Sequence, residues 1–173
     1  DTFQIATSAS LAAKFDKAWT EAYGASDDDD TTFCGTLYTD QPDGSRQLSM
    51  DSSIGDLGVI LQRHPQLPGR QCASPMDEKA LKFLYREPTA VNPEAGVEKH
   101  GVARIFVGVG GWICSKTRPD GNFAFVALSR ALGGPFSLFA WQAVLRWGWY
   151  LVRTKEYRLT YRTPAAGEHL CAW

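Results

Sequence analysis

The chain has 173 residues, of which 44% are hydrophobic and 21% are charged. This composition is ordinary for a globular protein, and the length allows a substantial core, so a wholly disordered chain, a collagen-like fibre and a pure coiled coil are excluded. The formal net charge of −1 makes nucleic acid an unlikely partner. We expect residues 1–173 to form one compact domain of the α+β class.

The N-terminal third of the chain predicts a helix, a hairpin and a second, shorter helix. Apolar residues recur every three or four positions between Ser8 and Tyr23, which is typical of an amphipathic helix. Further along, β-branched and aromatic residues flank a Pro-Asp-Gly turn, which favours a β-hairpin. The expected elements are a helix over 8–23, strands over 31–39 and 46–50, and a helix over 54–61.

The middle of the chain predicts a helix followed by a sheet. The sequence Ser-Pro-Met-Asp-Glu at 74–78 is typical of a helix N-terminus, and we expect this helix to end near Arg86, before Pro88. After it, apolar β-branched runs separated by glycine-containing turns favour strands. The expected strands cover 102–109, 112–116 and 122–128, and they make the predicted sheet mostly antiparallel.

A tryptophan-rich helix is expected over 134–152. Its polar residues are Ser137, Gln142 and Arg146, and the arginine would lie well inside a membrane-spanning helix, so we predict no transmembrane span. Because the helix is apolar nearly all round, it favours contact with another protein or with the edge of a membrane. The candidate binding residues on it are Trp141, Trp147 and Trp149.

The last expected strand, 156–163, alternates aromatic and aliphatic residues with basic ones. Arg158 and Arg162 share one face and are candidates for binding an acidic partner surface. The charge pattern also allows a second interpretation. Residues 1–60 carry eleven acidic and three basic side chains, whereas residues 61–173 carry eight acidic and fifteen basic. The two halves would then attract each other within one fold.

The four cysteines, Cys34, Cys72, Cys114 and Cys171, are widely spaced and form no Cys-x-x-Cys pair. Their even number predicts two disulfides of undetermined pairing, and therefore a secreted or otherwise extracytoplasmic protein. The alternative is four buried thiols in a reducing compartment. The three histidines show no metal-ligand spacing, so we expect neither a metal nor another cofactor.

One catalytic alternative is a thiol hydrolase that uses Cys34 and His100, because an imidazole beside a thiol generates the reactive thiolate. The stretch 100–115, HGVARIFVGVGGWICS, resembles the histidine strand of papain-like and NlpC/P60-type amidases. This resemblance implies a hydrolase of the cell-wall amidase type. The chain departs from those families at the cysteine, which they place at the start of a buried helix and which lies here in an expected strand.

A second catalytic alternative is an acid–base nuclease or toxin, which needs a base, an acid and a cation. The candidate residues are His64, His100, His169, Glu98 and Glu168, with Arg158 and Arg162 as cations. Our leading hypothesis is not enzymatic. The protein would act by surface recognition of another protein, as effectors, inhibitors and accessory subunits do, and whether it is an enzyme stays open.

Overall fold

The computed structural model describes residues 8–24, 31–64, 73–84 and 94–162. The protein belongs to the α+β class, as predicted, with several helices and one antiparallel sheet. In chain order the elements are α1 (Ala9–Tyr23), β1 (Thr32–Phe33), β2 (Thr36–Asp40), β3 (Arg46–Ser49), α2 (Asp51–Leu61), α3 (Glu78–Leu84), α4 (Val97–Lys116), the 3₁₀ turn η1 (Pro119–Gly121), α5 (Asn122–Ala131), α6 (Leu138–Arg153) and β4 (Leu159–Tyr161).

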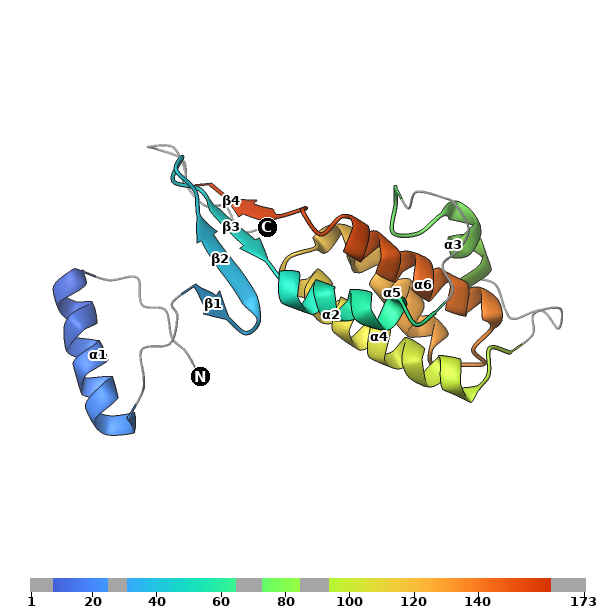
Figure 1. Cartoon of the computed structure of the whole chain (residues 1–173), viewed down its shortest axis with the longest axis horizontal. Coiled ribbons are helices and arrows are strands. Elements are labelled where there is room, and N and C mark those ends of the chain that lie inside the picture. Colours follow the sequence, from blue (N-terminus) through green and yellow to red (C-terminus); the bar gives the residue numbers. More distant parts are fainter. Residues whose placement is uncertain (1–7, 25–30, 65–72, 85–93, 163–173) are drawn as a thin grey trace.

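The helices α2 to α6 form a bundle, and the sheet extends beyond one end of it (Figure 1). α1 lies apart from both in the same view. The core belongs to the bundle, where the largest side chains that are almost completely buried include Trp147, Phe106, Ile113, Leu128 and Leu151. The sheet reaches this core through Met50, which follows β3 and is itself buried. The prediction of one domain over 1–173 stays a prediction.

Several predicted elements are confirmed. The first helix ends at Gly24, whose φ of 65° is the left-handed conformation that stops helices. The hairpin and the second helix form where they are expected, as β2, β3 and α2. The tryptophan-rich helix begins at Leu138, since the Ser137 hydroxyl accepts a hydrogen bond from the Ala140 backbone N–H at 3.1 Å.

The strands predicted over 102–109, 112–116 and 122–128 are wrong, because this stretch forms α4 and α5. Two of the glycines that suggested a turn, Gly110 and Gly111, are helix-packing residues instead. A Cβ atom at Gly110 would lie 2.5 Å from the Trp147 ring, and one at Gly111 would lie 2.3 Å from the Phe125 ring. Glycine therefore lets α4 pack closely against α6 and α5, and this packing outweighs the low helix propensity of glycine and valine.

Smaller differences lie at the ends of other elements. The middle helix begins at Glu78, with the Asp77 carboxylate accepting the Ala80 N–H at 2.7 Å, and its predicted end near Arg86 lies outside the described residues. The predicted strand 31–39 is divided into β1 and β2 by a tight turn at Cys34 and Gly35, both with positive φ. Of the predicted strand 156–163, β4 forms only at Leu159–Tyr161.

The sheet has the order β1-β2-β3-β4, and every neighbouring pair is antiparallel. β3 runs directly into α2, and α6 leads through a short turn into β4. Both connections therefore join the sheet to the same end of the bundle (Figure 1). The position of the sheet depends on this junction.

Candidate interaction surface

The two residues of the predicted thiol hydrolase do not meet. Cys34 lies exposed in the turn between β1 and β2. His100 lies near the start of α4, where its Nε2 is 3.1 Å from the Leu132 carbonyl oxygen and its ring stacks on Phe136. In Figure 1 the turn between β1 and β2 lies beyond one end of the bundle, and α4 begins at the opposite end. The stretch that resembles a histidine strand is helical, so neither the geometry nor the local fold of those amidases is present.

The described residues of the acid–base alternative do not come together either. The His64 ring makes an edge contact with Trp141 at 5.0 Å between centroids, and His100 is engaged as described. His169 and Glu168 lie outside the described residues. Within the described ranges, no cluster of three or more His, Cys, Asp and Glu side chains is arranged to hold a metal ion.

The described cysteines, Cys34 and Cys114, are both free thiols, one exposed and one buried. The predicted disulfides are not seen at these two residues, while Cys72 and Cys171 lie outside the described part of the chain. Burial raises the pKa of the Cys114 thiol to about 12, and the negative charge of the nearby Asp120 carboxylate contributes to the increase. Such a thiol stays protonated and unreactive at neutral pH.

The tryptophan-rich helix proves to be core, which corrects two of the predicted contact residues. Trp147 is completely buried and donates a hydrogen bond from Nε1 to the Gly121 carbonyl at 3.2 Å. Trp141 is 5% exposed. Trp149 is half-buried and lies under the Arg153 guanidinium. The polar residue inside this helix, Arg146, forms an ion pair with Asp77 at 3.2 Å.

The basic residues near β4 are partly used inside the molecule. Arg158 donates two hydrogen bonds of 2.8 Å to the Asp51 carboxylate, and a third to the Lys155 carbonyl. This ion pair joins the basic C-terminal half to the acidic N-terminal half, which supports the interpretation that the halves attract each other. Arg162 is exposed.

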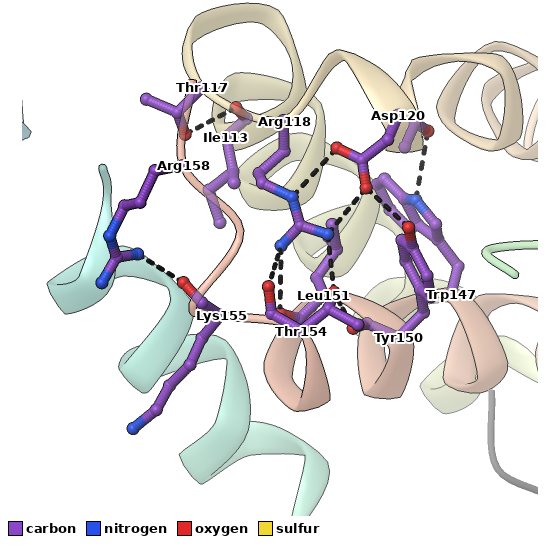
Figure 2. A network of polar contacts seen from close by, with 11 residues as sticks. Ile113, Thr117, Arg118, Asp120, Trp147, Tyr150, Leu151, Thr154, Lys155 and Arg158 are labelled. Atoms are coloured by element: carbon purple, nitrogen blue, oxygen red, sulfur yellow. Dashed lines mark hydrogen bonds and ion pairs between the residues drawn. The ribbon is translucent and has the colours of Figure 1, made fainter. Parts of the chain in front are cut away.

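A second arginine, Arg118, fixes the same junction from inside (Figure 2). It is 1% exposed, and its five N–H groups all have acceptors. Two bonds of 2.9 and 2.7 Å reach the Asp120 carboxylate, and three more reach the Leu151 carbonyl, the Thr154 carbonyl and the Thr154 hydroxyl. The guanidinium therefore caps the C-terminal end of α6, where a positive charge is favourable.

The carboxylate of Asp120 is held in turn by the Tyr150 hydroxyl at 2.7 Å. Burial pushes the pKa of Asp120 upward, but the hydrogen bonds from Arg118 and Tyr150 outweigh it and the pKa is below the usual value. Burial, together with the hydrogen bond to Asp120, raises the pKa of Tyr150 to about 12. Because every N–H donor of Arg118 is already bonded within the protein, the guanidinium has none left to bind a substrate. We therefore treat this network as a structural lock.

One face of the sheet carries large apolar side chains, and we call it the sheet surface. Opposite residues and residues two apart in a strand share a face. Tyr38, Leu48 and Leu159 form one row across three strands, and Tyr161 lies in the next row, beside Arg46. Phe33 lies on the same face, opposite Thr36. The members of the sheet surface are Phe33, Tyr38, Leu48, Leu159 and Tyr161.

The sheet surface is not part of the core. None of its five side chains is among the buried residues of the described chain; Phe33 is 38% exposed and Tyr161 is 57% exposed. The opposite face carries Thr39, Gln47 and Thr160 in one row, and Leu37, which is 38% exposed, beside Ser49 in the next row. The face with the five large side chains is therefore the more apolar of the two, and Phe33 and Tyr161 are its exposed members.

Sequence reasoning missed both the sheet surface and the Arg118 lock. The alternation of residues in 156–163 did place Tyr157, Leu159 and Tyr161 on one face. It did not show that the core lies elsewhere. No family model, curated protein or solved structure matches this chain.

None of the helices in the described ranges combines the length and the hydropathy needed to cross a membrane, in agreement with the predicted absence of a transmembrane span.

Proposed function

We propose that this protein acts by binding another protein through the sheet surface, rather than by catalysis. The observation that carries the proposal is the register of the sheet, which gathers three aromatic and two leucine side chains on one face outside the core. Aromatic residues are enriched at protein interfaces because they bury a large area at a small cost in side-chain entropy. Exposed apolar side chains in adjacent rows mark such contact sites.

The partner is expected to present apolar side chains rather than an acidic patch. Arg158 is already neutralised by Asp51, and Arg46 on the sheet surface itself is paired with Asp40 at 2.7 Å. The two ion pairs neutralise Arg158 and Arg46, while the exposed Arg162 follows Tyr161 in the chain. The Arg158–Asp51 pair joins the segment before β4 to the first residue of α2, and the arginine lock holds the end of α6 from which that segment leaves. We expect these contacts to limit the movement of the sheet surface before binding.

Residues on the two faces of β4 provide the matched test. A photo-cross-linking amino acid is placed at position 161 or at position 160, and the protein is exposed to an extract of the cells that produce it. We expect a discrete cross-linked partner from position 161 and not from position 160, because the two side chains point to opposite faces.

The affinity of the purified partner is then measured for Tyr161→Ala and for Thr160→Ala. An aromatic residue at the centre of an interface is worth about 2 kcal/mol or more, so Tyr161→Ala should weaken binding at least about 30-fold. Thr160→Ala should leave the affinity within about twofold. Equal effects of the two variants, or cross-links from both positions alike, would refute the proposal.

The predicted secretion is a separate proposal that rests on the cysteine pattern alone. Identification of Cys72 and Cys171 as a disulfide in the protein isolated from its source would support it, and two reduced thiols there would count against it.

A further inference from the structure

The outward face of α4 carries apolar residues that the described fold does not use. Ile105 is 56% exposed and Trp112 is 47% exposed, and both lie far from the sheet surface in the sequence. Gly101 and Gly108 alternate with them at the spacing 101, 105, 108 and 112, which places all four on one side of a helix. We call these four residues the α4 stripe. In Figure 1, α4 runs along one edge of the bundle.

Within the described part of the chain, the two glycines of the stripe pack against no other element. A Cβ atom at Gly101 or at Gly108 would meet nothing within 4 Å, in contrast to Gly110 and Gly111 on the buried side of the same helix. A glycine inside a helix costs roughly 0.5–1 kcal/mol relative to alanine. The chain therefore bears this cost twice on an exposed face, beside two exposed large side chains.

We propose that α4 is the contact between two copies of this chain, packed antiparallel about a twofold axis. When the axis passes midway between positions 106 and 107, position 105 faces position 108 of the second copy, and position 112 faces position 101. Each large side chain of the stripe then lies over a glycine of the other copy. The same pairing repeats by symmetry, as an isologous interface requires.

The charges at the ends of α4 fit the same arrangement. Glu98 and Lys116 are exposed and lie on the same side of the stripe. In this register position 98 faces position 115 of the second copy, so Glu98 and Lys116 lie one position apart, within reach of an ion pair, at both ends of the interface. Lys116 is held on this face by its contact with the Trp112 ring at 4.7 Å. Within one chain the two charges cannot pair, since 18 residues of helix separate them by about 27 Å.

The shape and the charge of the stripe are thus both self-complementary, which selects a second copy over an unrelated partner. A contact made by one helix pair is small, below the about 1,200 Å² of standard interfaces, so the dimer should be weak and concentration-dependent. This dimer leaves the sheet surface free, and it does not depend on the proposed function.

The test is sedimentation of the full chain over a range of concentrations, with charge reversals at the two ends of α4. Glu98→Lys gives like charges at both ends of the interface, and so does Lys116→Glu. We expect each variant alone to weaken the dimer about tenfold or more, because the repulsion occurs twice. Lys79→Glu, on the exposed side of α3, is the control and should leave the dimer unchanged.

An equimolar mixture of the two reversed variants decides between a direct contact and an indirect effect. In the mixed dimer, lysines face glutamates at both ends, so association should return to the wild-type level. Loss of helix-dipole stabilisation within one chain would not be restored by mixing. A wild-type chain that stays monomeric at every concentration would overturn the proposal. So would a dimer whose dissociation constant is unchanged by both charge reversals.

Discussion

The bundle and the sheet use their aromatic residues in opposite ways. In the bundle, Trp147 and Phe106 are completely buried. In the sheet, Phe33 and Tyr161 remain exposed although they lie on the apolar face. The bundle builds its core around its aromatic residues, whereas the strands of the sheet are held in register by backbone hydrogen bonds.

This difference shows that a high aromatic content does not by itself indicate a binding surface. Two of the three tryptophans that the sequence indicated as binding residues, Trp141 and Trp147, are buried in the bundle instead. The residues available for contact are a tyrosine and a phenylalanine in short strands. What separates the two groups is burial, and burial depends on which elements pack together.

The largest expected effect comes from truncating an aromatic residue in each region. Trp147→Ala removes a buried ring and its hydrogen bond to Gly121, and should lower the free energy of unfolding by about 3–5 kcal/mol. Tyr161→Ala should change it by no more than about 0.5 kcal/mol. Chemical denaturation followed by circular dichroism measures both. Similar losses for the two variants would mean that the sheet surface is core as well.

The arginine lock at the end of α6, from which the chain leaves toward the sheet, is tested by Arg118→Met. This change removes the guanidinium donors from the carbonyls of Leu151 and Thr154 and leaves the Asp120 carboxylate with the Tyr150 hydroxyl alone. It should cost about 3 kcal/mol in unfolding free energy. Arg104→Met, on the exposed side of α4, is the control and should cost less than about 0.5 kcal/mol. A loss below about 1 kcal/mol at Arg118 would show that the lock contributes little.

Alanine substitutions of two α4 glycines should change the free energy of unfolding by a smaller amount and in opposite directions. Gly111→Ala places a methyl group against the Phe125 ring, and should destabilise the protein by about 1–3 kcal/mol. Gly108→Ala meets nothing and should stabilise the monomer by about 0.4–1 kcal/mol. Thermal unfolding at low protein concentration measures both. A gain of stability in Gly111→Ala would contradict the close packing of α4 on α5.

The smallest effects are expected in the pH dependence of stability. The pKa of Asp120 is lowered in the folded state, so its contribution is present above the unfolded value near 4 and is lost as the pH falls through the folded pKa. Asp120→Asn should therefore flatten the acid limb of the stability curve. An acid limb identical to that of the wild type would mean that other carboxylates cause it.

At alkaline pH the stability is instead lost as the pH rises. The pKa of Tyr150 is raised to about 12 in the folded state, so its contribution is present below the unfolded value near 10 and is lost as the pH rises toward 12. Tyr150→Phe should reduce this loss between about pH 10 and 12, as measured by denaturation in buffered series. Loss of stability that is unchanged in the variant would assign the limb to Cys114, whose pKa is also raised.

The sequence predicted the fold best where local signals agreed with tertiary packing. The first helix, the hairpin and the tryptophan-rich helix all carry matching periodicity and end signals. The prediction of strands within 97–131 was wrong because valine, isoleucine and glycine have low helix propensity. Their packing against α6 cannot be recognised from the local sequence. The pattern was nevertheless present, since the buried Ala103, Phe106, Gly110 and Ile113 recur every three or four positions.

The candidate site could be predicted only in part. The strand near the C-terminus was expected, and Tyr161 was placed on its apolar face. The sequence could not show that Arg158 pairs with Asp51, because 107 positions separate them. The lock at Arg118 depends in the same way on Tyr150 and Thr154, which only the folded arrangement brings to η1.

The central claim is that the aromatic residues of the bundle are buried and those of the sheet are exposed. Hydroxyl-radical footprinting of the free protein tests this claim most directly, because it measures the exposure of each aromatic side chain without a partner. We expect Tyr161 and Phe33 to be oxidised rapidly, and Trp147 to react only when the protein unfolds. Protection of Tyr161 to the same degree as Trp147 would show that the sheet surface is covered, and would contradict its role as the contact surface.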